Sequence, residues 1–446
     1  MIYSGAALFA PSLSGLVACS KSMESGATRD ALAGAGGYGP LTVAGAELAL
    51  PRGFKYTVLS VAGGKMSDGR PIPNSHDGMA AFPMRNGNVR LLRNHENRDT
   101  PAKSTVKGNA SLAYDSRAGG CVTSLEVRID SNGPPVVVKE FVSSSGTIVN
   151  CAGGLTPWGS WLTCEESVAG TTQEWSRNHG YVFEVPASAE AQVPAQPLTA
   201  MGRFVHEAAA VDPVTGIVYE TEDLAPGGFY RFIPRTKSVL SAGGVLQMLA
   251  IRDNPQYNTA KGQTVGKVLL AFWVTIADPD PANAGEDPSA VHRQGVALGG
   301  ASFSRLEGCW FGDKSIYFNA TNGGEAMCGQ VWRYRPTSDT AGELTLVFES
   351  PSPEVLKSPD NITVSPRGGL LLCEDAGTDQ YMRGLTRDGR IFDFAHVIGP
   401  STEVAGACFS PNGCVLFFNI QGSTRDAGAA LGMTFAVTGP WGKGAL

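Results

Sequence analysis

One short pattern recurs six times along the chain: an apolar run, a tight turn rich in Asn, Asp, Pro or Gly, a second apolar run, and then a polar cluster. Two apolar runs joined by such a turn indicate a β-hairpin. Several copies are followed by a further apolar run with aromatic residues, such as YVFEVP, GFYRFIP or QVWRYRP. The six copies occupy residues 79–96, 153–166, 208–223, 308–321, 362–375 and 406–420.

These repeats predict an all-β fold, a six-bladed β-propeller with loop insertions. The blades of a propeller are small four-stranded sheets around a central channel, so each hairpin with its following strands supplies one blade. We expect one propeller domain over residues 46–446, with insertions at 97–120 and 237–303 that cover its faces. The 56 glycines and the charged fraction of 17% suit many short strands and turns rather than helices.

Polar residues stand on both sides of each hairpin. The start of the first strand of a hairpin lies beside the end of the second, so both sets are predicted at the end opposite the turn. The set before the first run is His76/Asp77, Asn150, His206/Glu207, Arg305/Glu307, Asp360/Asn361 and Glu403. The set after the second run is Arg93/Asn94 with Glu96, Glu165/Glu166, Glu222/Asp223, Asn319, Glu374/Asp375 and Asn419.

A closed ring of such hairpins would place roughly ten carboxylates at one mouth of the channel. The repulsion between these carboxylates and their lost hydration require a compensating positive charge. Cages of oxygen atoms are what Ca²⁺ prefers, so hard cations are the simplest answer. Cys164 precedes Glu165 and Glu166 and adds a soft donor that a ferric or other transition ion accepts, although a strand-end cysteine can equally be a small buried residue.

Three further residues are candidates for contact with a substrate: Asn94, Glu96 and Asn361. Each Asn can also be an oxygen ligand or a turn former. Arg305 lies near Glu307, and its planar guanidinium suits either bidentate capture of a phosphate or a simple ion pair with that carboxylate.

Several of the sequence motifs resemble those of a known family. NHE, GGLTPWGSWLTCEE, MGRFVHEAAAVD, VYETED, GGFYRFIP, RLEGCWFGD, SPDNITVSPRGGLLLCED and CFSPNG look like the PhoX-type alkaline phosphatases, from about residue 50 to the C-terminus. The resemblance implies a six-bladed propeller with two ferric and three calcium ions in its channel. It also implies that Cys164 binds iron, that Arg305 is the catalytic residue that holds the phosphate, and that the ions are shared by Glu165, Glu207, Glu222, Asp223, Glu307, Glu374 and Asp375.

The N-terminus suggests export. Residues 1–19 carry no charge and end in Leu-Val-Ala-Cys, which resembles a signal segment with a lipoprotein cleavage site at Cys19, without the usual basic start. Residues 20–45, rich in Gly, Ala and Ser, are predicted to be a tether. We therefore expect a periplasmic or secreted protein with a lipid anchor at Cys19, and a monomer.

The leading hypothesis is an exported, metal-dependent phosphatase that hydrolyses small phosphorylated organic substrates, with a diesterase or triesterase as a close variant. Two alternatives stay open: a lactonase-type calcium propeller, and a propeller that uses calcium only structurally and binds a partner. The formal net charge of −6 gives no basic stripe, which argues against nucleic acid as a partner.

Overall fold

The computed structural model describes residues 37–130, 133–377, 379–399 and 402–446. In this part of the chain the named strands pair only in antiparallel fashion, and they form five hydrogen-bonded sheets. The first sheet contains β4 (His76–Pro83), β5 (Val89–His95), β6 (Gly120–Arg128) and β7 (Val136–Thr147). The second contains β8 (Asn150–Leu155), β9 (Ser160–Glu165) and β10 (Val182–Pro186).

The third sheet has nine strands because β15 joins two groups of four. The first group is β11 (His206–Val211), β12 (Val218–Glu222), β13 (Phe229–Pro234) and β14 (Gly244–Ile251). The bridging strand and the second group are β15 (Val268–Thr275), β16 (Leu306–Gly312), β17 (Ser315–Ala320), β18 (Gln330–Pro336) and β19 (Ala341–Glu349). The insertion predicted at 237–303 therefore forms β14, β15 and the helix α1 (Ala290–Ala297).

The last two sheets combine strands from both ends of the chain. One contains β20 (Pro359–Val364), β21 (Leu370–Glu374), β22 (Tyr381–Leu385) and β23 (Ile391–Val397), extended by β2 (Leu48–Pro51) and β1 (Leu41–Val43). The other contains β24 (Val404–Phe409), β25 (Val415–Ile420), β26 (Met433–Thr438) and β3 (Lys55–Val61). Five 3-10 helices complete the described elements: Ala110–Leu112, Thr171–Gln173, Thr199–Met201, Leu240–Ala242 and Trp441–Lys443.

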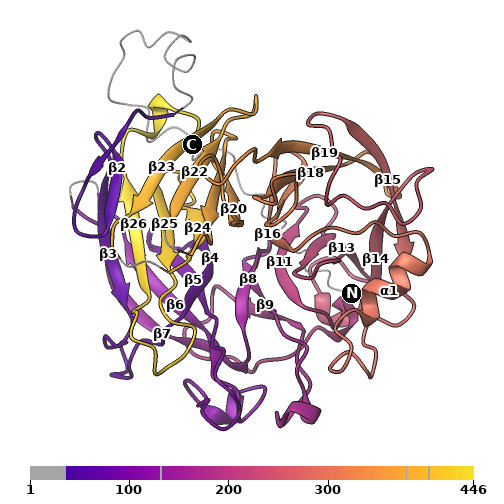
Figure 1. Ribbon diagram of the computed structural model, residues 1–446. Coiled ribbons are helices and arrows are strands. Elements are labelled where there is room, and N and C mark those ends of the chain that lie inside the picture. Colours follow the sequence, from indigo (N-terminus) through magenta and orange to yellow (C-terminus); the bar gives the residue numbers. More distant parts are fainter. Residues whose placement is uncertain (1–36, 131–132, 378, 400–401) are drawn as a thin grey trace, which may run out of the picture.

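The first strands of the hairpins form a closed circle. Strand β4 contacts β8, and the contacts continue through β11, β16, β20 and β24 back to β4. Figure 1 shows the sheets fanned about a common centre with these strands nearest to it. The prediction of an all-β, propeller-like fold is confirmed.

Turn chemistry fixes the hairpins. Gly87 and Gly159 close the β4–β5 and β8–β9 turns at φ of 85° and 86°, a left-handed conformation that glycine adopts without steric cost. The β16–β17 hairpin instead uses Asp313 and Lys314, at φ of 49° and 57°, as the two central residues of its turn. Two successive left-handed residues match the right-handed twist of the flanking strands.

Apolar side chains fill the spaces between neighbouring sheets. Leu91 and Leu125 of the first sheet pack against Phe417 of the last, and Leu92 packs against Trp161 of the second. These side chains are buried, so burial of both faces of each sheet holds the ring together.

The N-terminal predictions meet the structure only in part. The predicted signal or lipoprotein segment, residues 1–19 with Cys19, lies outside the described residues. Strand β1 falls within the predicted tether at 20–45, so the tether prediction is wrong for Leu41–Val43, which pair with β2. No helix in the described ranges is long and apolar enough to cross a membrane.

Candidate metal centre

All six hairpins share one irregularity near the start of their first strand. The register between the paired strands shifts between His76 and Met79 in β4, and it shifts at the corresponding place in β8, β11, β16, β20 and β24. A β-bulge of this kind adds a residue to one strand and re-aims the side chains beside it. The first residues inside the shifts are Asp77, Cys151, Glu207, Glu307, Asp360 and Gly406.

Neighbouring inner strands approach closely at these bulges. A Cβ atom added to Gly308 would lie 2.7 Å from the backbone oxygen of Asp360, so only glycine fits beside the next bulge. The bulge carbonyls are held by side chains from the preceding hairpin: Asn94 donates to Cys151 O at 2.8 Å, and Asn319 donates to Asp360 O at 2.8 Å. The backbone that carries the candidate ligands is therefore fixed by hydrogen bonds between blades.

A second set of carboxylates meets the bulge residues. Glu96, Glu166 and Asp375 each follow directly after the last residue of a second strand, and Glu403 lies just before β24. With the bulge residues they form four overlapping groups in which the possible ligand atoms lie within 4.8 Å of one another. The groups are Asp77/Glu96/Cys151, Cys151/Glu166/Glu207, Glu207/Glu307/Asp360 and Asp360/Asp375/Glu403.

The groups form one continuous centre because Cys151, Glu207 and Asp360 each belong to two of them. Most members line a cavity of about 370 Å³. Glu207 is 0% exposed, and neither of its carboxyl oxygens accepts a hydrogen bond from a described nitrogen or hydroxyl group. A buried carboxylate without donors requires a proton or a cation, and the oxygen-rich donor set with one sulfur fits metal ions.

The pKa directions agree with this crowding. Burial, followed by the charges of Asp360 and Glu166, holds the pKa of Glu207 well above its usual range. Burial also raises the pKa of Asp77 to about 6 and that of Glu166 to about 8, although Arg98 opposes the rise in Glu166. The cluster therefore binds protons when it binds no cation, and metal binding must displace them.

Two arginines form ion pairs with carboxylates of the cluster. Arg305 donates from Nε and Nη2 to Asp223, both at 2.9 Å, and from Nη2 to Glu307 at 2.8 Å. Arg98 directs Nη2 to both Glu96 and Glu166. Both guanidiniums line the same cavity, so it carries positive groups as well as an acidic ring.

The family model described as Alkaline phosphatase PhoX matches residues 36–423, which contain all of the residues above. The chain belongs to the PhoX alkaline phosphatase family. Pseudomonas fluorescens PhoX, in complex with vanadate, a transition state analogue, is similar in structure with a TM-score of 0.69 at 19% identity. That similarity covers 92% of this chain and 99% of the other, and it supports the propeller-like fold.

Weaker similarities extend to other proteins. The gluconolactonase XC5397 of Xanthomonas campestris has a TM-score of 0.44 at 13% identity, over 90% of this chain and 100% of the other. A streptogramin B lyase has a TM-score of 0.38 at 12% identity, over 87% of this chain and 98% of the other. No curated protein sequence matches the chain significantly.

In this PhoX family member the structure brings together only part of the predicted ligand set. Glu207, Glu307 and Asp375 lie in the four candidate ligand groups. Asp223 lies beside them through its ion pair with Arg305. Arg305, predicted as the catalytic residue, does line the cavity, and it also pairs with Glu307.

Three predicted carboxylate ligands lie one residue out of place. Each is the last residue of a second strand, and its carboxylate accepts at least one hydrogen bond from a protein donor. Glu165 accepts from His179 at 2.6 Å, Glu222 accepts from Tyr230 at 2.8 Å, and Glu374 accepts from Arg383 at 3.0 Å. Glu165, Glu222 and Glu374 are not members of the four groups. They lie beside the site, and the residue that follows each of them lies in or next to the cluster.

The prediction for Cys164 is also corrected. Its side chain is 0% exposed and packs in an apolar cluster with Leu162, Val182 and Ala209. The cysteine that belongs to the candidate ligand groups is Cys151, at the bulge of β8. Strict alternation of strand residues does not place Cys151 in the channel, because only the bulge turns its side chain there.

Of the three residues predicted to contact a substrate, one lies in the cavity and two lie outside it. Glu96 belongs to one of the candidate ligand groups. Asn94 is 0% exposed and fully engaged, since it also donates to Ala152 O at 2.7 Å and accepts from Trp161 Nε1 at 2.8 Å. Asn361 is buried and does not line the acidic cavity. Asn94 and Asn361 are thus part of the framework rather than of the cavity wall.

The residues that the sequence prediction left out are Asp77, Cys151, Glu166, Asp360 and Glu403. Most of them belong to the polar sets that flank the hairpins. Membership of those sets was the sequence feature that could have identified them as candidate ligands. Sequence could not show which member of each adjacent pair faces the channel.

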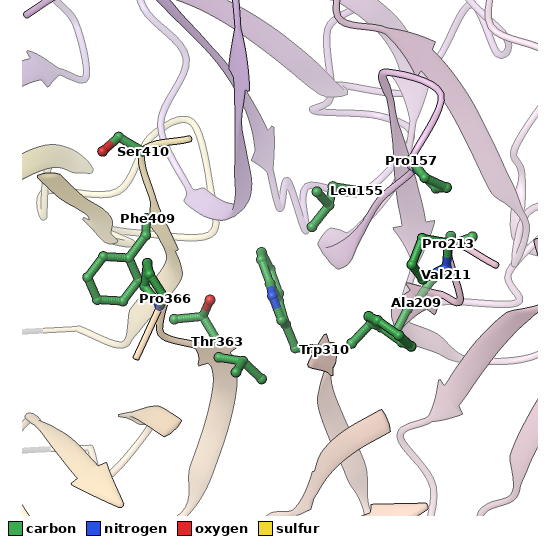
Figure 2. Close-up of a pocket in the computed structure, with 13 residues that line it drawn as sticks. Leu155, Pro157, Ala209, Val211, Pro213, Trp310, Thr363, Pro366, Phe409 and Ser410 are labelled. Atoms are coloured by element: carbon green, nitrogen blue, oxygen red, sulfur yellow. The ribbon is translucent and has the colours of Figure 1, made fainter. Parts of the chain in front are cut away.

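The opposite end of the inner strands is apolar. Figure 2 shows Trp310 between Thr363, Pro366 and Phe409 on one side and Leu155 on the other, around a pocket of about 280 Å³. No charged residue lines this pocket. The titratable groups of the candidate centre therefore lie at the bulge end of the inner strands.

Proposed function

We propose that this chain is a metal-dependent phosphatase that hydrolyses phosphomonoesters at the acidic cluster. The observation that carries the proposal is the set of four overlapping ligand groups beside two arginines in one cavity, in a member of the PhoX family. A cavity of this kind can neutralise a phosphoryl group from several sides, which is the main requirement of phosphoryl transfer.

We further propose that the ring consists of six blades. The nine-stranded sheet then counts as two blades, β11–β14 and β16–β19, with β15 as an added strand. The closed circle of six inner strands supports this count. The six bulges place one potential ligand position per blade, and five of these positions carry an acidic residue or cysteine.

The donor set fits two kinds of metal ion, and iron together with calcium is our proposal. Cys151 supplies a thiolate for a transition ion, while the carboxylates suit a hard cation such as Ca²⁺. Two ferric and three calcium ions, as the family resemblance implies, remain part of this proposal. When bound, such ions supply Lewis acidity toward phosphoryl oxygens and activate the attacking water.

The protein's own residues position the substrate. The guanidinium of Arg305 is fixed by Asp223 and Glu307, yet its side chain is 42% exposed toward the cavity. Its Nη1 donates to no described protein atom, so it is available to a phosphoryl oxygen. The ion pairs with Asp223 and Glu307 restrict rotation of Arg305, so orienting the substrate costs little additional side-chain entropy.

We also propose export to the periplasm or beyond, with a lipid anchor at Cys19 and a monomeric enzyme. The uncharged segment 1–19, which ends in Leu-Val-Ala-Cys, supports the export and the anchor. Labelling of cells with a radioactive fatty acid tests the anchor, since Cys19→Ala must abolish incorporation.

The test of function uses two buried glutamates of the same hairpin. The purified protein should contain iron and calcium by elemental analysis and should hydrolyse p-nitrophenyl phosphate, with activity lost to a calcium chelator and restored by calcium. Glu207→Gln should lose both metal and activity, because Glu207 belongs to two ligand groups. Glu222→Gln is the matched control, since Glu222 lies outside those groups and its Oε2 accepts from Tyr230 Oη and Gly228 N.

Full activity of a metal-free preparation would refute the proposal. Hydrolysis of a lactone, or of phosphodiesters in preference to phosphomonoesters, would point to the alternative enzyme classes. Metal binding without any hydrolysis would favour a structural calcium propeller.

A further inference from the structure

Positive charge is distributed unevenly around the four candidate ligand groups. Arg98 pairs with Glu96 and Glu166, which belong to the two groups that contain Cys151. Arg305 pairs with a carboxylate of the third group. In the described part of the chain, no Lys, Arg or His forms an ion pair with the fourth group, Asp360/Asp375/Glu403.

The carboxylates near Arg98 also have more protein donors than others in the ring. Asp77 accepts from a backbone N–H at 2.6 Å, and Glu96 Oε2 accepts from Gln421 at 2.7 Å. Oε1 of Glu96 lies in the ion pair with Arg98, although this contact falls outside hydrogen-bond geometry. Glu207 accepts from no described nitrogen or hydroxyl group. The protein therefore supplies its own positive charge beside Glu96 and leaves Glu207 to a proton or an added cation.

The side chain of Arg98 is held by a single nitrogen. Nη2 contacts both Glu96 and Glu166, while Nε and Nη1 donate to no atom of the described chain. The side chain is 42% exposed and lines the cavity, whereas the backbone is fixed by its N–H, which donates to Thr424 O at 2.7 Å. The guanidinium can therefore leave the two carboxylates without breaking another hydrogen bond.

Arg98 remains a cation in this position. Burial acts to lower its pKa, but the charges of Glu96 and Glu166 raise the pKa above its usual value. A metal ion that binds either carboxylate must therefore compete with a full positive charge.

We propose that Arg98 competes with metal ions for Glu96 and Glu166, so that ions on the Cys151 side of the ring bind more weakly than their donors alone allow. Activity then follows the free metal concentration, because this side of the ring fills only when the metal displaces Arg98. The inference rests on the proposed phosphatase function and specifies how that function is regulated.

The test titrates the metal-depleted full-length protein with Co²⁺ at a fixed pH. Thiolate-to-cobalt absorption is the signal, because it reports on ions bound at a cysteine and so on the two groups that contain Cys151. Arg98→Gln and Arg98→Ala should each lower the Co²⁺ concentration at half-saturation by about tenfold, the effect of removing one charge-assisted contact from the competition. Arg98→Lys should stay close to the wild type, because its ammonium keeps the positive charge.

Lys107→Gln is the matched control. It removes a nearby cation that pairs with Asp426 and does not line the cavity, so the cobalt titration should not change. Hydrolysis of p-nitrophenyl phosphate gives a second measurement. After treatment with a chelator, the Ca²⁺ concentration that restores half of the activity should fall in Arg98→Gln and stay unchanged in Lys107→Gln.

The outcomes separate the two levels of the proposal. If the wild type binds no metal and hydrolyses no phosphomonoester, the proposed function itself fails. If it does both, and Arg98→Gln binds Co²⁺ as tightly as the wild type or more weakly, the role of Arg98 is wrong, because a residue that only holds Glu96 and Glu166 in place would strengthen metal binding. An equal gain of affinity in Lys107→Gln would also overturn the proposal, since the effect would then come from net charge alone.

Discussion

Asn94 offers a sharp test of how the framework controls the metal centre. It belongs to β5 but makes three hydrogen bonds across the blade boundary, two to the bulge carbonyls of Cys151 and Ala152 and one from Trp161. Asn94→Leu keeps the side-chain size and removes all three bonds. At roughly 1 kcal/mol for each net hydrogen bond, the loss is about 3 kcal/mol, and the buried groups left without partners increase it.

The effect should also reach the thiol of Cys151, because Asn94 holds its carbonyl oxygen. Urea unfolding of the metal-free protein measures the stability change, and the thiolate-to-cobalt absorption of the Co²⁺-substituted protein reports the position of the sulfur. Asn94→Leu should lower the free energy of unfolding and weaken that absorption.

Asn319→Leu provides the matched control. Asn319 makes the corresponding bond to Asp360 O, at the far side of the cluster from Cys151. Its substitution should cost about 1 kcal/mol for one bond and leave the thiolate absorption intact. An Asn94→Leu protein with wild-type stability and unchanged cobalt absorption would refute the idea that these amides position the bulges.

Two other predictions follow from the buried groups. His179 contacts Glu165 at 2.6 Å and Asp115 at 3.3 Å; burial acts to lower its pKa, but these carboxylates raise it from 6.5 to about 9. The contribution of His179 to stability is therefore full below pH 6.5 and is lost as the pH rises to 9, a change of about 3 kcal/mol. His179→Gln should flatten the fall in the free energy of unfolding over this pH range. An equally steep fall in the variant would contradict the assignment. Cys151→Ser should abolish the thiolate absorption of the cobalt protein, whereas Cys164→Ser should keep it and lose stability in its apolar cluster, and the reverse result would restore Cys164 as the ligand.

Much of the fold was accessible from the sequence because hairpin patterns are local. Turn residues such as Gly87 and Gly159 mark the reversals, and the apolar runs beside them mark the strands. The polar sets also indicated which end of the channel holds the chemistry. What the sequence did not reveal is β15, which fuses two groups of strands, because its pairing with β19 joins residues far apart in the chain.

The site was predicted less well because its residues depend on bulges. Alternation alone could not choose between Glu165 and Glu166, because adjacent strand residues differ only in the face that they occupy. The same holds for Glu374 and Asp375. At Cys151 and Asp77 the bulge alters the expected face, and a bulge in these strands leaves no distinct residue signature. Only the paired register, which includes both strands of each hairpin, resolves the choice.

The pairing of β3 with β26 sets a condition on biosynthesis. Lys55 is paired with Thr438, so this sheet cannot be completed until nearly the whole chain has left the ribosome. Until then the apolar face of the neighbouring sheet, including Leu91 and Leu125, lacks the cover that Phe417 of this sheet supplies. Chain entropy opposes such a distant closure, so the ring should form late and slowly, and chains that end before β26 should be substrates for chaperones and proteases rather than partly active enzymes.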